Sequence, residues 1–173
     1  MNTYTSIFHS QNHILDIISY TLSSYASSTA TFREKKTPFH SSKTVTVSLF
    51  SYLKSNMQTY SGIINFMRCS DSCYIIALVL LDRIKSMNPI YTLTPRNVYK
   101  LFFTAVLIAV KSNDDHFFSQ EYYSKVGGLK LKEISDLELL FINSLEFNIY
   151  VDSQTFENYG KKLVQLYEEE NVG

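Results

Sequence analysis

Histidine and cysteine are the first side chains to consider for metal binding or covalent chemistry, and this sequence places two pairs of them one helical turn apart. His9 and His13 form one pair, but no third ligand is near, so a solvated pair is the more common outcome. Cys69 and Cys73 form the other pair, at the start of an expected helix, where ordinary buried thiols are the better interpretation. Neither pair predicts a functional site.

Other signatures of enzyme chemistry are missing from the sequence. It contains no glycine-rich phosphate loop, no Cys or His cluster with metal-ligand spacing and no nucleophile elbow, and His40 and His116 are isolated. Sixteen basic and sixteen acidic residues give a net charge of zero, so the long-range attraction that nucleic-acid binders use is absent. We therefore expect a module that binds other proteins, without catalysis, a cofactor, a metal or nucleic acid.

The compartment is predicted from the N-terminus and the cysteine content. The first residues lack a basic head followed by an apolar run, and two cysteines cannot make a disulfide framework in a chain of 173 residues. We expect an intracellular protein with reduced thiols, in the cytoplasm, the nucleus or both.

Any binding surface must be positioned by the helix predicted within the segment 94–111. The positions from 100 to 110 are apolar apart from Lys100 and Thr104, and Thr94 with Pro95 is typical of an N-cap followed by a first-turn proline. A helix without a polar face must be covered by other elements, so the sequence predicts a buried central helix. The segment is shorter than the roughly 20 residues that span a bilayer, and we expect no membrane association.

Apolar residues at helical spacing predict further helices on both sides of the central one, and no segment alternates like a strand. The predicted ranges are 11–26, 47–60, 73–87, 119–126 and 130–147, with a last helix that begins at Asp152 or Ser153 and runs to the acidic residues 168–170. Gly127 and Gly128 follow one of these helices and suit a left-handed C-cap. We expect an all-α chain: an N-terminal helix and linker (1–36), a main domain (37–150) and a C-terminal helix with a tail (151–173).

Asp82 is the one acidic residue within the apolar helix predicted at 73–87. A buried carboxylate without a partner would cost several kcal/mol, so we expect a cation close to it. Arg83 is adjacent in sequence, but neighbouring residues of a helix do not face each other. The partner must come from another element.

Four strings, in this order along the chain, resemble the cyclin box, a fold of five helices around a buried central helix, here with flanking N- and C-terminal helices. They are CYIIALVLLDRI (73–84), LTPRNVYKLFFTAVLIAVKSNDD (93–115), EYYSKVGGL (121–129) and DLELLFINSLEFNIYV (136–151). The Tyr-Tyr and Gly-Gly combination is similar to the single-box P/U-type cyclins, the phosphate-response family of fungi, plants and protists. ILDIISYTLSS (14–24) and PFH (38–40) also resemble that family, so the resemblance covers about residues 14–150.

The resemblance implies a regulatory subunit that binds and activates a cyclin-dependent protein kinase, with kinase substrates or inhibitors as further partners. In such cyclins a lysine that closes the third helix and a glutamate of the fifth grip the kinase's regulatory helix, and these match Lys111 and Glu138. The apolar part of that contact matches Ile108, Ile142, Phe147 and Ile149. A lysine at a helix C-terminus and a glutamate on a helix are also common without any such role.

Two departures from the family pattern affect these expectations. Ser112 and Asn113 stand where an aromatic residue or leucine usually follows the lysine, which removes apolar contact with the kinase. The first-helix arginine that commonly pairs with the aspartate of the second helix falls near Ser55, with Lys54 beside it as a candidate cation for Asp82.

A cyclin-fold scaffold that binds a protein other than a kinase is the alternative function. General transcription factors with this fold normally carry two boxes and basic surfaces, whereas this chain has one predicted box and balanced charge. The sequence leaves open which kinase is bound and whether the role lies in phosphate signalling or in cell-cycle timing.

Overall fold

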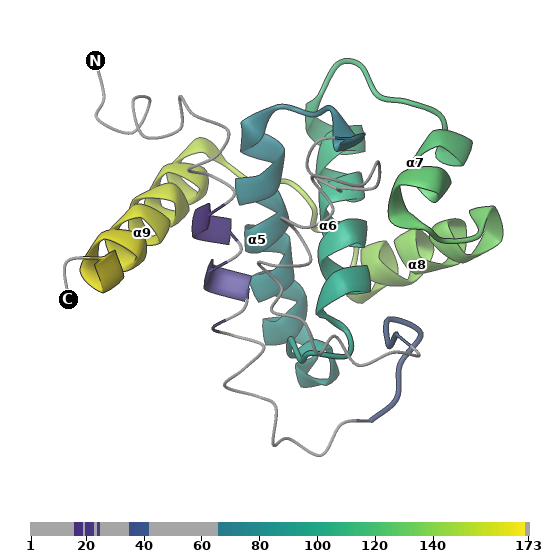
Figure 1. Cartoon of the computed structure of the whole chain (residues 1–173), viewed down its shortest axis with the longest axis horizontal. Helices are drawn as coiled ribbons and strands as arrows, with labels where there is room; N and C mark the ends of the chain where they lie inside the picture. Colours follow the sequence, from purple (N-terminus) through teal and green to yellow (C-terminus); the bar gives the residue numbers. More distant parts are fainter. Residues whose placement is uncertain (1–15, 19, 23, 25–34, 42–65, 172–173) are drawn as a thin grey trace.

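A computed structural model of the chain describes residues 16–18, 20–22, 24, 35–41 and 66–171 (Figure 1). The helix predicted at 47–60 lies outside the described residues, as do His9, His13, Lys54 and Ser55. Of the helix predicted at 11–26, the described residues are helical.

The described residues form helices and connecting segments without any strand, so the predicted all-α fold class is confirmed. The helices, with the labels of Figure 1, are α5 (Asp71–Met87), the short 3-10 helix η1 (Pro89–Tyr91), α6 (Val98–Asn113), α7 (Gln120–Gly127), α8 (Leu131–Ser144) and α9 (Ser153–Asn171). None of them is both long enough and apolar enough to cross a bilayer, and within the same residues no three His, Cys, Asp or Glu side chains gather as metal ligands.

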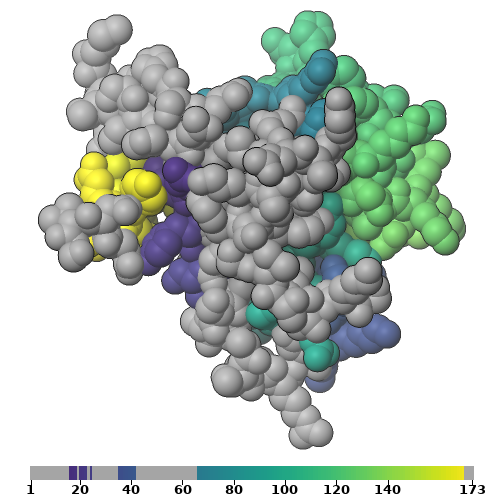
Figure 2. Space-filling model, in the orientation of Figure 1, coloured from purple at the N-terminus to yellow at the C-terminus, as the bar shows by residue number. Residues whose placement is uncertain are grey.

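Helix α6 is the buried centre of the described fold, as its composition predicts. Every residue from Leu101 to Val110 is buried, and α5 is buried almost as completely from Cys73 to Leu81. The two helices run side by side, with α8 against α6, α7 against α8, and α9 against the other side of α5 (Figure 1). In the space-filling view α7 and α8 form one edge of the molecule, and α9 lies at the opposite edge (Figure 2).

The start of α6 differs from the prediction. The first-turn role expected for Pro95 is wrong, because the helix begins at Val98 and Asn97 is the residue before it. The Asn97 side chain folds back to accept a hydrogen bond from Thr94 N (2.8 Å) and to donate one to Thr92 O (2.9 Å). Asn97 therefore fixes the turn that leads into α6.

The two adjacent glycines at the end of α7 have different roles. Gly128 is the left-handed C-cap, with φ 62° and ψ 29°, as predicted. Gly127 is the last residue of the helix, and a Cβ there would lie 2.6 Å from Cζ of the Phe103 ring. The predicted left-handed C-cap is thus formed by the second glycine of the pair, while Gly127 allows α7 to approach α6 closely.

Asp82 finds its partner on the last helix. The Tyr159 hydroxyl of α9 donates a short hydrogen bond to Asp82 Oδ2, so among the described residues a neutral hydroxyl contacts the carboxylate. The candidate cation Lys54 lies outside those residues. The contact ties α9 to α5.

Helix α8 is also packed against a segment far from it in sequence. The Phe39 ring is 0% exposed and makes edge-to-face contacts with Tyr91 and Phe141, at ring-centroid distances of 5.6 Å and 6.2 Å. Such pairs add about 0.5–1.5 kcal/mol beyond the area that they bury. Through Phe39, residues 35–41 thus help to hold the buried face of α8 in the core.

Candidate protein-binding site

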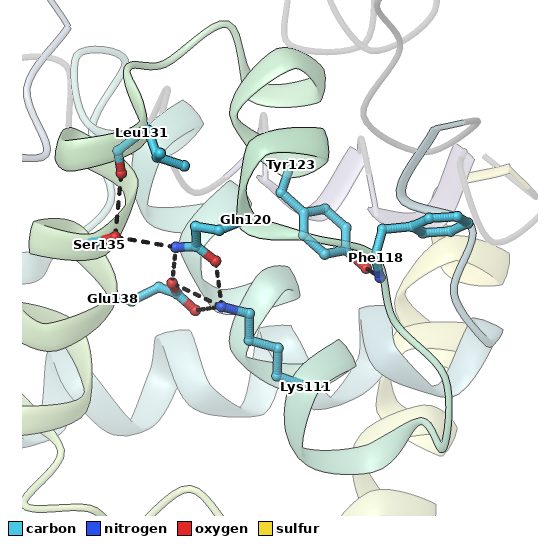
Figure 3. Close-up of polar contacts among 7 residues, drawn as sticks. All are labelled: Lys111, Phe118, Gln120, Tyr123, Leu131, Ser135 and Glu138. Carbon is cyan, nitrogen blue, oxygen red and sulfur yellow. Dashed lines mark hydrogen bonds and ion pairs between the residues drawn. The ribbon is translucent and has the colours of Figure 1, made fainter.

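Lys111 and Glu138, which come from different helices, form an ion pair at one end of the core (Figure 3). Lys111 lies in the last turn of α6 and its Nζ is 2.8 Å from Glu138 Oε1 and 3.0 Å from Oε2. The side chains are 30% and 12% exposed, respectively. The two charges that the resemblance singles out therefore point toward each other and share one surface.

Gln120 hydrogen-bonds to both members of this ion pair, and no motif or spacing in the sequence indicates that role. As the first residue of α7, it accepts a hydrogen bond from Lys111 Nζ and donates one to Glu138 Oε2 (Figure 3). Its amide nitrogen also lies 3.5 Å from Ser135 Oγ. The three side chains therefore link α6, α7 and α8, and we call Lys111, Gln120 and Glu138 the polar triad.

The loop before α7 is fixed by a buried tyrosine. Phe118 N donates a hydrogen bond of 3.1 Å to the Tyr123 hydroxyl (Figure 3), and burial raises the pKa of Tyr123 despite this bond. Ser119 Oγ accepts a hydrogen bond from Tyr122 N and so caps the helix. These contacts hold the first turn of α7 in place and position Gln120 for the polar triad.

The apolar residues implied by the resemblance differ in exposure. Phe147 is 70% exposed, and Ile142 and Ile149 are half-buried. Ile108 is 2% exposed and lies among the core residues of α6, so its side chain is not on the surface of the free chain, and its expected contact with a kinase stays a prediction. The helix turns the Ile108 side chain inward, and it supports the surface from beneath.

Further exposed apolar side chains lie on α8 and after it. Leu139 is 59% exposed and Leu131 is 51% exposed on α8, and Tyr150 is 78% exposed beyond its end. Leu139 interrupts the buried stripe of Ile134, Leu137 and Phe141, so a leucine outside the helical stripe was the signal that could have identified it. Exposed aliphatic and aromatic residues on the helix that carries Glu138, and just after it, are typical of a protein-binding surface.

The turn after α8 holds two consecutive residues in the left-handed region. Helix α8 ends at Ser144, earlier than predicted, and Glu146 and Phe147 have φ values of 52° and 62°. For residues other than glycine this backbone costs about 1 kcal/mol or more each. A hydrogen bond of 3.0 Å from Phe147 N to Ile142 O closes the turn. The strained turn carries the most exposed phenylalanine of the described residues.

The end of α6 is fixed to the start of α5 by Asp114. Its carboxylate accepts hydrogen bonds from Ser70 N (2.9 Å) and from the Ser70 hydroxyl. Burial acts to raise the pKa of Asp114, but the Ser70 hydrogen bonds outweigh it and hold this pKa below its usual value. Ser112 and Asn113, which form the first of the two departures from the family pattern, are exposed and follow Lys111 directly.

Cys69 and Cys73 contact each other at the start of α5. The hydrogen bond between the thiols lowers the pKa of Cys73, and that bond together with burial raises the pKa of Cys69. Cys73 is buried and Cys69 is half-buried. The sequence predicts ordinary buried thiols at both positions, and this description fits Cys73 better than the half-buried Cys69.

The sequence matches the family Cyclin over residues 6–149. Curated relatives from Arabidopsis thaliana include Cyclin-U4-1, which is 35% identical over 130 residues (75% of this chain, 61% of the relative), and Cyclin-U4-3, 34% identical over 148 residues (84% and 64%). Cyclin-P3-1 of Oryza sativa subsp. japonica is 32% identical over 127 residues (73% and 50%). The chain spans between half and two thirds of the length of these relatives.

Proposed function

Because the chain belongs to the cyclin family, we propose that it is an intracellular regulatory subunit that binds a cyclin-dependent protein kinase and activates it, without catalysis of its own. The observation that carries this proposal is the polar triad; α8, which supplies Glu138, and the turn after it also carry the exposed side chains of Leu139 and Phe147. The triad joins the last turn of α6, the first residue of α7 and the middle of α8.

The proposed mechanism is stabilisation of one kinase conformation. A kinase whose regulatory helix is misplaced lacks a catalytic Lys–Glu ion pair, and a surface that binds only the inward position of that helix shifts the population toward it. Moving the equilibrium from 1:99 to 99:1 requires about 5.5 kcal/mol of differential binding. Full burial of a Leu or Phe side chain supplies about 1.5–3 kcal/mol. Because Leu139 and Phe147 are 59% and 70% exposed in the free chain, burying the remainder of both provides about 2–4 kcal/mol, and other contacts of the surface supply the rest.

The polar triad has a different role from the apolar residues in this proposal. Lys111 and Glu138 already contact each other in the free chain, so binding does not have to order two long side chains. Their charges contribute little net affinity after desolvation, but they fix the register of the partner helix. Lys111 is the more exposed of the two, and it offers the larger part of the charged contact.

Glu138→Ala tests the proposal, with Glu133→Ala as its matched control. Glu133 lies on the same helix and also pairs with a lysine of α6, Lys100, at 2.7 Å. We expect Glu138→Ala to lose co-purification with the kinase and Glu133→Ala to keep it, while circular dichroism shows unchanged helicity in both. Lys111→Ala should behave like Glu138→Ala. Kinase activation that is undiminished in both triad variants refutes these site assignments.

The scaffold alternative is separated from the kinase proposal by one further assay. Proteins retained by the chain from an extract of its own cells are tested for phosphoryl transfer to added substrate. Activity that depends on the wild-type chain and is lost with Glu138→Ala supports the kinase partner. A retained protein without phosphoryl-transfer activity, held equally by both forms, supports the scaffold.

A further inference from the structure

Arg83 of α5 reaches across the surface to the turn that follows α8. Its Nη1 donates hydrogen bonds to the backbone carbonyls of Asn148 (2.6 Å) and Tyr150 (2.9 Å), and lies 3.4 Å from Asn148 Oδ1. These contacts join α5 to a segment far away in sequence. Hydrogen bonds from a charged donor are about twice as strong as those between neutral groups.

The segment that Arg83 holds is the strained one. The turn 145–150 contains the left-handed residues Glu146 and Phe147, and such backbone persists only where surrounding contacts determine it. The hydrogen bonds from Phe147 N to Ile142 O and from Asn148 N to Leu145 O secure its first half. The Arg83 bonds secure its second half.

The same turn presents its large side chains to solvent. Phe147 and Tyr150 are 70% and 78% exposed, one on each side of the backbone carbonyl of Asn148 that Arg83 contacts. Exposed aromatic side chains gain most from binding when they are held in one arrangement beforehand, because ordering them then costs nothing at the moment of association. Arg83 is suited to this task, since a planar guanidinium offers several donors in fixed directions, whereas an ammonium does not.

We infer that Arg83 is a positioning residue that holds the 145–150 turn so that Phe147 and Tyr150 meet the protein partner in a single conformation. This inference rests on the proposed function for the identity of the partner. Arg83 itself acts through the backbone of the turn, so the partner need not touch it. Without Arg83 only a fraction of the chains presents the turn in the binding conformation. The apparent association constant is then the intrinsic one multiplied by that fraction.

The kinetic consequence separates this role from a structural one. Substitution of Arg83 removes two charge-assisted hydrogen bonds, and water replaces them in part. We expect the fraction of chains that hold the turn in the binding conformation to fall about tenfold. The association rate constant for the kinase then falls about tenfold, because fewer encounters are productive. The dissociation rate constant changes little, because the bound turn makes the same contacts as before.

The test compares Arg83→Gln with Lys125→Gln, which also removes one positive charge but from an exposed pair with Glu121 on α7. Association and dissociation rates with the kinase are measured for both, and for Arg83→Gln combined with Phe147→Ala. We expect slower association for Arg83→Gln only, and a much smaller effect of this change when Phe147 is already alanine. Arg83→Lys, which retains the charge and the apolar stem, should recover part of the rate and guards against a glutamine variant that fails to fold.

Two results overturn the inference. One is an association rate for Arg83→Gln equal to that of Lys125→Gln. The other is an effect of Arg83→Gln that adds in full to that of Phe147→Ala, since a positioning residue must act through the side chain that it positions.

If the wild-type chain binds no kinase, the proposed function is refuted, but the positioning role of Arg83 can still be tested. The test is then amide hydrogen exchange of the free chain. Faster exchange at residues 147–151 in Arg83→Gln, at an unchanged melting temperature, supports the positioning role. Unchanged exchange there overturns it.

Discussion

Substitution of Gly127 by alanine isolates the contact that lets α7 approach the buried helix. A Cβ at this position would lie 2.6 Å from Phe103 Cζ and 2.9 Å from both Cε atoms of the same ring. Phe103 is 0% exposed and stacks against Tyr99, with ring centroids 6.4 Å apart, so the ring cannot move without displacing its neighbours. The substitution therefore forces α7 away from α6.

The expected cost follows from two opposing effects. Alanine favours the helical state over glycine by about 1 kcal/mol. Overpacking of a buried site costs about 1–3 kcal/mol, and contact with three ring atoms below 3.0 Å places Gly127 at the upper end of this range. The net loss is about 2 kcal/mol, which lowers the melting temperature of a chain of this size by about 4–8 °C.

Thermal and urea unfolding measure this loss, and two further variants test its cause. Phe103→Leu opens space beside Gly127, so the double variant should lose less stability than the sum of the single losses. Gly128→Ala is the matched control: nothing lies within 4 Å of its Cβ position, and its cost of about 1 kcal/mol comes from φ 62° alone. Phe103→Leu should not rescue Gly128→Ala. An unchanged stability of Gly127→Ala, or equal rescue of both glycine variants, refutes the steric account.

Two other predictions concern the end of α6. The lowered pKa of Asp114 means that its hydrogen bonds with Ser70 stabilise the folded chain above the unfolded-state pKa of about 3.9, and that this contribution is lost as pH falls through the folded pKa. The stability difference between wild type and Asp114→Asn in urea unfolding should therefore shrink as the solution is acidified. A constant difference contradicts this assignment. Ser112→Leu restores an apolar side chain at an exposed position beside Lys111 and should raise kinase affinity by up to about tenfold in a titration, without a change in melting temperature. Unchanged affinity would place Ser112 outside the contact.

Much of the helical framework follows directly from the sequence. The apolar run that ends at Lys111 predicts a buried helix because no polar face remains, and α6 is buried throughout that run. Gly128 is predicted as a C-cap because glycine favours the left-handed conformation, and it adopts that conformation.

The parts that the sequence did not predict depend on contacts between distant residues. Gln120 joins Lys111 through a contact that only the packing of α7 beside α6 and α8 creates. The partner of Asp82 among the described residues is Tyr159, which lies on the last helix, so no local spacing indicates it. Ile108 matches a contact position of the family, yet its burial depends on how α6 is rotated in the core.

The dissociation constant of the kinase complex for Glu138→Ala, measured beside Glu133→Ala, tests the central claim most directly. Removing one half of a partly buried charged contact costs about 2–5 kcal/mol, so we predict affinity at least about 30-fold weaker for Glu138→Ala and close to wild type for Glu133→Ala. Equal affinities of the two variants would contradict the claim that the polar triad lies in the kinase contact.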